Sequence, residues 1–358
     1  MSVPFRVGVM QLTSEPTDKI LAQARAMDRC GFDTIWLAEA YPWWRKHGLE
    51  ARSLTALSSV VATQTRRLAI GWGIISVYSR HPITVAMDAR VTQEAAGANR
   101  FYLGLGASKI LMREIGEGER KVARPRLAMK ESLEMIRQLL AGAEVAYRGE
   151  EFWTVVPALR PEAEAPRTPV PLYVAGTGPK IQQLAGEAAD GLLTPSITTP
   201  EFVRYSKRNV REGATVSGRD AETVDIGCTL VASIDEDRAK GRDGAREIAA
   251  MYLANKVQNI QVSADTLLQL AGIDREEIIP VAEAMERGGR LAAKEAVSDS
   301  LLDKCKPIAV TPRECVQRIE EYRDAGCTHI MLELWGADRE RQLELFGKKV
   351  LPEVLRGR

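Results

Sequence analysis

The residues from Gly176 to Pro179 form a loop that could bind an anion. The sequence Gly176-Thr177-Gly178-Pro179 lies between the apolar run 171–175 and a helix-like segment that begins at Lys180. The backbone N–H groups of such a loop and the positive end of the following helix can hold a phosphate group. Glycine and proline also occur in ordinary tight turns, which is the alternative interpretation.

A second unusual sequence, Trp72-Gly73-Ile74-Ile75, closes the apolar run 68–75. Glycine inside a strand often marks a bulge or a place where the backbone approaches a ligand closely. A planar ring could rest against such a strand end. Together, the two sequences suit a large, flat, phosphorylated cofactor.

Other catalytic chemistries find little support in the sequence. The histidines His47, His81 and His329 are not spaced as metal ligands, so no metal site is predicted. His81 precedes a proline and is expected to have a capping or packing role rather than one in acid–base catalysis, while His329 lies in a strand pattern and is expected to be structural. No Gly-x-Ser-x-Gly sequence follows a strand, which disfavours a serine hydrolase.

The elements that must position these residues are predicted from eight mostly apolar runs. Each run is followed by a loop and a helix-like stretch, and buried parallel strands have this continuous apolar character. The runs are 5–10, 33–38, 68–75, 100–105, 171–175, 191–194, 225–232 and 328–334. The pattern predicts an α/β fold, a TIM (β/α)8 barrel that spans residues 1–358 as one domain.

Because barrel enzymes place their sites at the carboxyl ends of the strands, the candidates can be collected by position. The residues that follow strands are Glu39, Tyr41, Trp44, Ser76, Tyr78, Gly106, Ala107, Ser108, Lys109, Gly176, Thr177 and Gly178. We expect Tyr41, Trp44, Trp72 and Tyr78, with Lys109, to line a substrate pocket. The alternative for the aromatic residues is ordinary core packing.

Two segments do not fit the repeating pattern. Residues 148–171 predict a long excursion before the fifth strand. Residues from about 255 to 310 are helix-like and polar without a strand of their own, and we interpret them as an insertion that covers the barrel mouth. Long insertions in compact domains often act as lids, although a role in oligomer contact is the alternative.

Composition limits the partners and the compartment. The 49 basic and 48 acidic residues leave a formal charge of +1, which argues against nucleic acid or an anionic membrane as a partner. No signal-peptide pattern or membrane-spanning run is present, and the five cysteines lack the spacing of a disulfide framework. We therefore expect a cytoplasmic protein that acts on a small molecule, as a homodimer or higher homo-oligomer.

The order of several segments resembles the luciferase-like monooxygenase superfamily, and within it the oxidoreductases that depend on the deazaflavin coenzyme F420. The resemblance covers nearly the whole chain and is closest to methylenetetrahydromethanopterin reductases. The segments that carry it are Cys30-Gly31-Phe32-Asp33, Trp36-Leu37-Ala38-Glu39, Leu68-Ala69-Ile70-Gly71, Asn99-Arg100-Phe101, Leu103-Gly104-Leu105-Gly106, Ala189-Asp190-Gly191 and Ser233-Ile234-Asp235-Glu236-Asp237.

The resemblance implies a role for each candidate. A non-proline cis peptide that supports the deazaflavin ring would be Gly73-Ile74, and the acidic residue after the second strand would be Glu39. We expect Glu39 to bind the ring, with proton transfer as the alternative. The phosphate contacts would be Gly176, Thr177 and Gly178, and further cofactor contacts would be Ser76, Gly106, Ala107 and Ser108.

The chain also departs from its apparent relatives. The sugar-phosphate dehydrogenase branch has a histidine where this chain has Ala40 and a glutamate where it has Lys109, which disfavours that branch. The reductases' strand-one glutamate is replaced by Met10, with Gln11 beside it. We predict an F420-dependent hydride-transferring oxidoreductase. The alternatives are an FMN-dependent monooxygenase and a non-catalytic cofactor-binding protein.

Overall fold

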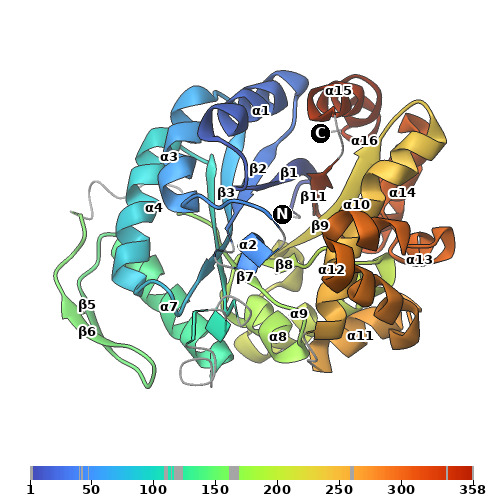
Figure 1. Ribbon diagram of the computed structural model, residues 1–358. Helices are drawn as coiled ribbons and strands as arrows, with labels where there is room; N and C mark the ends of the chain where they lie inside the picture. The colour runs from blue at the N-terminus through green and yellow to red at the C-terminus, as the bar shows by residue number, and fades with distance from the viewer. Residues whose placement is uncertain are drawn as a thin grey trace.

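The protein forms a closed barrel of parallel strands surrounded by helices, as the predicted TIM barrel requires (Figure 1). The structure is a computed structural model that describes residues 3–39, 41, 43–46, 48–108, 112–113, 115–116, 124–160, 169–258, 262–335 and 338–356. The barrel strands are β1 (Arg6–Leu12), β2 (Thr34–Ala38), β3 (Ala69–Ser76), β4 (Phe101–Gly106), β7 (Leu172–Ala175), β8 (Gly191–Thr194), β9 (Asp225–Ile234) and β11 (His329–Leu334). Pairing of β8 with β9 closes the ring. All eight predicted strands are confirmed.

The helices lie outside this ring and begin and end where the sequence signals them. The first, α1 (Thr17–Cys30), starts after Pro16 and ends at Gly31, which has a left-handed backbone with φ of 86°. His81 caps α4 (Pro82–Ala96), because its Nδ1 accepts a hydrogen bond of 3.2 Å from the Ile83 amide. The others are α2 (Trp43–Lys46), α3 (Leu54–Gln64), α7 (Pro125–Leu140), α8 (Pro179–Ala188), α9 (Pro200–Ser217), η2 (Ala221–Thr223), α14 (Pro312–Asp324), α15 (Arg339–Leu345), η3 (Phe346–Val350) and α16 (Leu351–Val354).

A small apolar core fills the inside of the barrel. It consists of Met10, Trp36, Tyr173, Leu193 and Met331, and all five side chains are buried. Inward-facing glycines make room for the aromatic rings. A Cβ added at Gly71, for example, would lie 2.2 Å from the Trp36 ring, closer than any real contact. The alternate residues of each strand point outward and pack against the helices.

A polar network closes the amino-terminal end of the barrel. Asp225 forms an ion pair with Arg6, accepts a hydrogen bond of 2.6 Å from the Tyr173 hydroxyl, and lies 3.4 Å from His329 Nδ1. Burial opposes ionisation of Asp225, but the contacts with His329 and Arg6 outweigh it and hold its pKa below the usual range. His329 is therefore structural, as the sequence predicted.

Helices cover one side of the barrel mouth. They are α10 (Arg238–Gln258), α11 (Val262–Leu270), α12 (Arg275–Glu295) and α13 (Asp299–Lys304). The expectation that 255–310 contains no strand was wrong at its end, where β10 (Ile308–Val310) pairs with β9. The physical reason is that β9 extends beyond its pairing with β8, which ends at Cys228, so its last residues can accept another strand.

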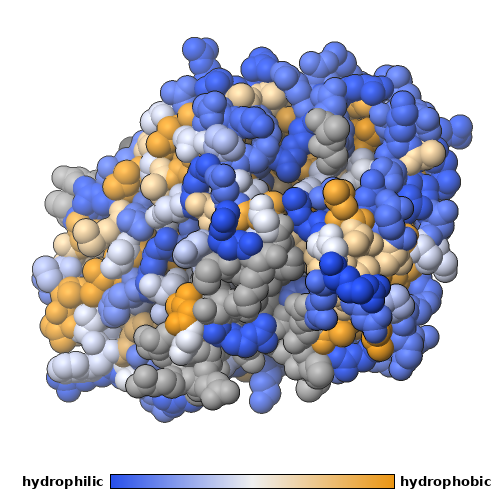
Figure 2. Space-filling view, viewed as in Figure 1, coloured by the Kyte–Doolittle hydropathy of each residue, from blue (hydrophilic) through white to orange (hydrophobic). Residues whose placement is uncertain are grey.

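The excursion before β7 begins with a hairpin that sequence analysis missed. Its strands β5 (Val145–Arg148) and β6 (Trp153–Val156) pair in antiparallel fashion and project away from the barrel (Figure 1). The buried carboxylate of Glu131 in α7 accepts hydrogen bonds from three backbone amides of the hairpin turn. Trp153 and Val155 remain 69% and 67% exposed. Hydrophobic residues are visible at this edge of the face in Figure 2, as they are at several other places on it.

Among the described residues, no helix has the length and apolar character needed to cross a membrane.

Candidate active site

The ends of β3, β4 and β7 lie side by side at the barrel mouth and form the first part of the candidate site. The Gly73-Ile74 peptide is cis, as the family resemblance implied, and the pairing of β3 with β4 shifts register between Trp72 and Ile75. A Cβ added at Gly73 would lie 3.0 Å from Met10 Cε. Gly73 therefore lies directly on the inner core of the barrel.

Ile74, Gly106 and Ala175 lie together beside this bulge, and we call these three apolar residues the platform. A Cβ added at Gly106 would lie 2.7 Å from Ile74 Cδ1 and 3.7 Å from Ala175 Cβ. Ile74 and Ala175 are partly buried and pack on the inner core. A side chain at position 106 would therefore require Ile74 to move, so glycine at this position keeps the Ile74 side chain in place.

Ser76 joins the ends of β3 and β4 next to the platform. Its Oγ donates a hydrogen bond of 3.4 Å to the Ala107 carbonyl and accepts one of 3.3 Å from the Tyr78 amide. Ser108 follows with a left-handed backbone at φ of 46° and is half-buried. Lys109 lies outside the described residues. The predicted cofactor contacts Ser76, Gly106, Ala107 and Ser108 are therefore brought together in space.

The loop Gly176–Gly178 lies beside the platform, and its Gly176 amide donates a hydrogen bond of 3.3 Å to the Leu193 carbonyl. Two buried side chains fix the carbonyl side of the loop. Gln182 Nε2 donates a hydrogen bond of 3.2 Å to the Thr177 carbonyl, and Asn209 Nδ2 donates one of 2.7 Å to Gln182 Oε1. Gly178 caps α8 without a side-chain hydrogen bond. Within the described part of the chain, the Thr177 and Gly178 amides have no partner, so they and the helix end can bind an anion.

Gln182 and Asn209 were not predicted from the sequence. Their exposed fractions are 0% and 7%. Buried polar side chains on the inner faces of two helices would have been the signal, but sequence alone does not show which face is buried. They are supporting residues of the loop.

Glu39 lies at the mouth after β2 with both carboxylate oxygens engaged. Oε1 accepts a hydrogen bond of 2.6 Å from Arg80 Nη1, and Oε2 accepts one of 2.7 Å from the Leu54 amide at the start of α3. The carboxylate thus holds Arg80 and the end of a helix in place. This geometry favours a positioning or binding role for Glu39 over proton transfer.

The four predicted aromatic wall residues have different environments. Trp44 is buried in a cluster with Leu12 and Ile197 where the covering helices meet the barrel, and Tyr41 is 62% exposed. The Tyr78 hydroxyl is buried without a hydrogen-bond partner among the described residues, and burial raises the pKa of Tyr78 to about 12. Trp44, Tyr41 and Tyr78 remain candidates.

The expectation that Trp72 lines the pocket was wrong. Its side chain is fully buried in the layer between the barrel and the helices, where its Nε1 donates a hydrogen bond of 2.8 Å to Ser58 Oγ of α3. Strand alternation is the physical reason, because Gly71 and Gly73 face the inside of the barrel and Trp72 must then face outward.

A buried carboxyl group at the other side of the mouth was missed by sequence analysis. Glu333 lies on β11 at an inward position, two residues after Met331 of the inner core, and is 1% exposed. Its oxygens accept hydrogen bonds of 2.8 Å from Ser196 Oγ and from the Tyr252 hydroxyl. Burial raises the pKa of Glu333 to about 7. The available signal was one acidic residue in an otherwise mainly apolar strand.

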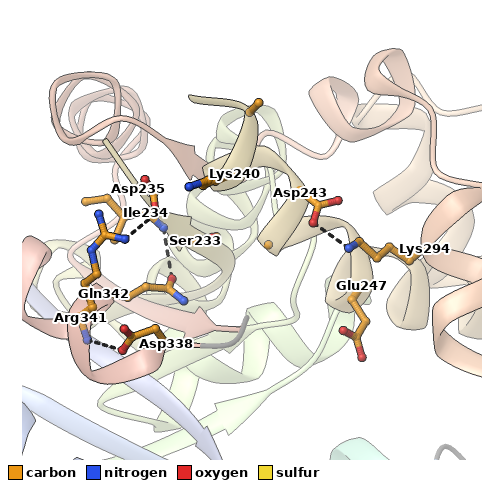
Figure 3. A pocket seen from close by; sticks show the side chains of 12 residues that line it. Ser233, Ile234, Asp235, Lys240, Asp243, Glu247, Lys294, Asp338, Arg341 and Gln342 are labelled. Atoms are coloured by element: carbon orange, nitrogen blue, oxygen red, sulfur yellow. Dashed lines mark hydrogen bonds and ion pairs between the residues drawn. The ribbon is translucent and has the colours of Figure 1, made fainter. Parts of the chain in front are cut away.

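A charged cavity of about 590 Å³ lies outside the barrel between the end of β9, α10, α12 and α15. Figure 3 shows two charge pairs in its lining, Arg341 with Asp235 on one side and Lys294 with Asp243 on the other. Gln342 of α15 accepts a hydrogen bond of 3.2 Å from the Ile234 amide of β9 and so connects two walls of the cavity. Because most of its charges are neutralised internally, this cavity is a weaker candidate than the barrel mouth.

A closed barrel with small residues and polar groups gathered at the carboxyl ends of its strands defines an α/β-barrel enzyme with its site at the mouth. Residues 1–329 match the luciferase-like monooxygenase family, and the chain belongs to this family.

Several known proteins are similar over nearly their whole lengths. A 5,10-methylenetetrahydromethanopterin reductase of Archaeoglobus fulgidus is 28% identical over 90% of this chain and 92% of its own. An F420-dependent glucose-6-phosphate dehydrogenase of Amycolatopsis mediterranei is 27% identical over 95% of each chain. The solved structure of the coenzyme F420-dependent tetrahydromethanopterin reductase from Methanopyrus kandleri has a TM-score of 0.85 at 25% identity, covering 98% of this chain and 99% of that chain.

Proposed function

We propose that this protein is an oxidoreductase that uses the deazaflavin coenzyme F420 to transfer a hydride to or from a small organic substrate. The observation that carries the proposal is the apolar platform of Ile74, Gly106 and Ala175 beside the loop Gly176–Gly178, whose Thr177 and Gly178 amides have no partner among the described residues. The F420-dependent relatives support it.

The residues present fit this cofactor. The ring would lie on the platform and the cis Gly73-Ile74 peptide, and the phosphate would meet the Thr177 and Gly178 amides at the positive end of α8. Ser76, Ala107 and Ser108 are close enough to the platform to contact the ring edge. When bound, the cofactor supplies the hydride chemistry.

The protein's own contribution is to place the substrate and to exclude water. The four helices from α10 to α13 pack on the barrel through a buried cluster that includes Leu12, Trp44 and Ile197. These helices can therefore form one wall above the platform. Tyr41, Tyr78 and Lys109 are our candidates for contact with the substrate. Glu39 would keep Arg80 and the start of α3 in position beside it. Such placement can lower the barrier to hydride transfer.

Fluorescence titration with F420 and with FMN tests the proposal. We expect micromolar or tighter binding of F420 and at least about tenfold weaker binding of FMN, about 1.4 kcal/mol. Equal or stronger binding of FMN would assign the protein to the flavin monooxygenases instead.

Two loop variants locate the phosphate group. Gly178→Val adds a bulky side chain that should block the close approach of the loop backbone to the phosphate. We expect F420 binding to weaken by about 2 kcal/mol, the scale of losing a charge-assisted hydrogen bond. Thr177→Val keeps the backbone amides and serves as the matched control, with little expected change. Normal binding by Gly178→Val would place the phosphate elsewhere.

We also propose a homo-oligomer that acts in the cytoplasm. The exposed Trp153 and Val155 of the hairpin support subunit contact, and five free cysteines suit a reducing compartment. Sedimentation of wild type and Trp153→Ser at equal concentration tests the proposed homo-oligomer. We expect wild type to sediment as an oligomer and Trp153→Ser to shift toward the monomer.

A further inference from the structure

Three segments of the barrel mouth meet at the carboxyl group of Glu333. Glu333 belongs to β11, Ser196 follows β8, and Tyr252 comes from α10. Both hydroxyl groups lie 2.8 Å from the carboxyl oxygens, one on each oxygen. Glu333 and Ser196 are 1% and 5% exposed, while Tyr252 is half-buried. The carboxyl group is thus held in place and screened from bulk water.

The surroundings of Glu333 provide little positive charge. Arg339 of α15 is the cation that acts on it, and this arginine already forms an ion pair with Glu15. Among the described residues, the other groups that lower the pKa of Glu333 are the Ser196 and Tyr252 hydroxyls and Trp335, which are neutral. Burial therefore dominates and raises the pKa of Glu333 to about 7.

Both protonation states of Glu333 can keep complete hydrogen bonding. The ionised carboxylate accepts from Ser196 and Tyr252, as observed. A protonated carboxyl group instead donates to one of these hydroxyls, which then turns its own hydrogen elsewhere. The Tyr252 hydroxyl can make that turn. Its helix α10 packs against Leu12 at the end of β1, on the same side of the barrel as the carboxyl ends of the strands.

We propose that Glu333 stores the proton of this site and passes it through the Tyr252 hydroxyl to the oxygen or nitrogen atom of a carbonyl or imine substrate. The inference rests on the proposed hydride-transfer function and names its substrate class. It also explains why a carboxyl group without a strong cationic partner stands at the carboxyl end of a barrel strand.

The proton and electron balance of the step is complete. In reduction, the substrate carbon receives a hydride and a C–H bond forms, while the π electron pair moves to the heteroatom. The heteroatom takes the proton of the Tyr252 hydroxyl, and the Glu333 O–H bond breaks to restore that hydroxyl. The carboxylate then regains a proton from water. Oxidation of the alcohol or amine follows the same path in reverse.

Infrared titration of the protein without cofactor tests the stored proton. Wild type should show a protonated carboxyl band that disappears with a midpoint about pH 7, and Glu333→Gln should lack it. Tyr252→Phe removes one donor to the carboxylate and should move the midpoint upward by about half a unit or more. A midpoint below about pH 5 in wild type, or a band that persists in Glu333→Gln, would overturn the proposal.

Calorimetric titration with F420 in buffers of different ionisation enthalpy tests the connection to the site. F420 binding should exclude water from the mouth and raise the pKa of Glu333 further. At about pH 7, wild type should therefore take up protons when F420 binds, and Glu333→Gln should take up fewer. Equal proton uptake in the two proteins would show that Glu333 is separate from the site and refute the relay. Absence of F420 binding would instead refute the proposed function and the relay with it, whatever the infrared result.

Discussion

Replacement of Glu333 by glutamine should change the pH dependence of stability in a predictable direction. Burial raises the pKa of Glu333 from 4.5 to about 7, so the folded protein binds this proton more tightly than the unfolded chain. The stabilisation that results is complete below pH 4.5 and is lost as the pH rises through about 7. Glutamine imitates the neutral form at every pH.

The expected magnitude follows from this shift. A shift of about 2.5 units at about 1.4 kcal/mol per unit corresponds to about 3 kcal/mol over the whole pH range. Between about pH 5 and about pH 8.5, the free energy of unfolding of Glu333→Gln should therefore rise relative to wild type by about 2 to 3 kcal/mol. A constant offset between the proteins does not affect this comparison.

Urea unfolding at fixed protein concentration, followed by tryptophan fluorescence, measures this difference at each pH. Glu283→Gln serves as the control, because it removes a carboxylate from an exposed ion pair with Arg287 on α12. Such pairs contribute about 1 kcal/mol or less. An unchanged difference between wild type and Glu333→Gln at the two pH values would mean that Glu333 is ionised at both, and the reasoning from burial would fail.

Two further substitutions separate positioning from chemistry and from stability. Glu39→Gln should retain most F420 affinity and turnover, because the glutamine oxygen can still accept a hydrogen bond from Arg80 or the Leu54 amide. Glu39→Ala removes the acceptor and should weaken F420 affinity. A loss of about 100-fold in rate with normal F420 binding in Glu39→Gln would indicate proton transfer instead. Asp225→Asn should lower the free energy of unfolding by about 3 kcal/mol, since it leaves the partly buried Arg6 without its counter-charge. F420 affinity of the folded Asp225→Asn protein should stay normal, and weak binding would show that the two ends of the barrel are coupled.

The sequence predicted the barrel because its strands are buried on both faces and therefore read as continuous apolar runs. The same property concealed which residues of a run face inward. Trp72 was assigned to the pocket for this reason, although the neighbouring glycines Gly71 and Gly73 already indicated the inner face. The hairpin β5–β6 escaped prediction because its turn depends on Glu131, a residue distant in sequence.

The candidate site was predicted in part. The loop Gly176–Gly178 and the bulge at Gly73 have local signals, since glycine and proline restrict backbone geometry wherever they occur. Gln182 has no such local signal, and the single acidic residue in the apolar strand β11 did not reveal the partners of Glu333, because the surroundings of both residues are created by segments far away in the chain. Contacts across the fold, such as that of Glu333 with Tyr252, require the three-dimensional arrangement.

Two inward residues of β11, His329 and Glu333, lie next to or carry buried carboxyl groups whose pKa values are shifted in opposite directions. The pKa of Asp225, beside His329, is lowered, and the pKa of Glu333 is raised. His329 meets the ionised Asp225 at the closed end, and burial raises the pKa of Glu333 at the open end, about 13 Å further along at 3.3 Å per residue. The packed layer around Met331 separates the two and keeps water from joining them. An engineer could therefore exchange residues around the open end to accept new substrates while the closed end continues to anchor the fold, and β11 marks the boundary between the adaptable and the fixed half.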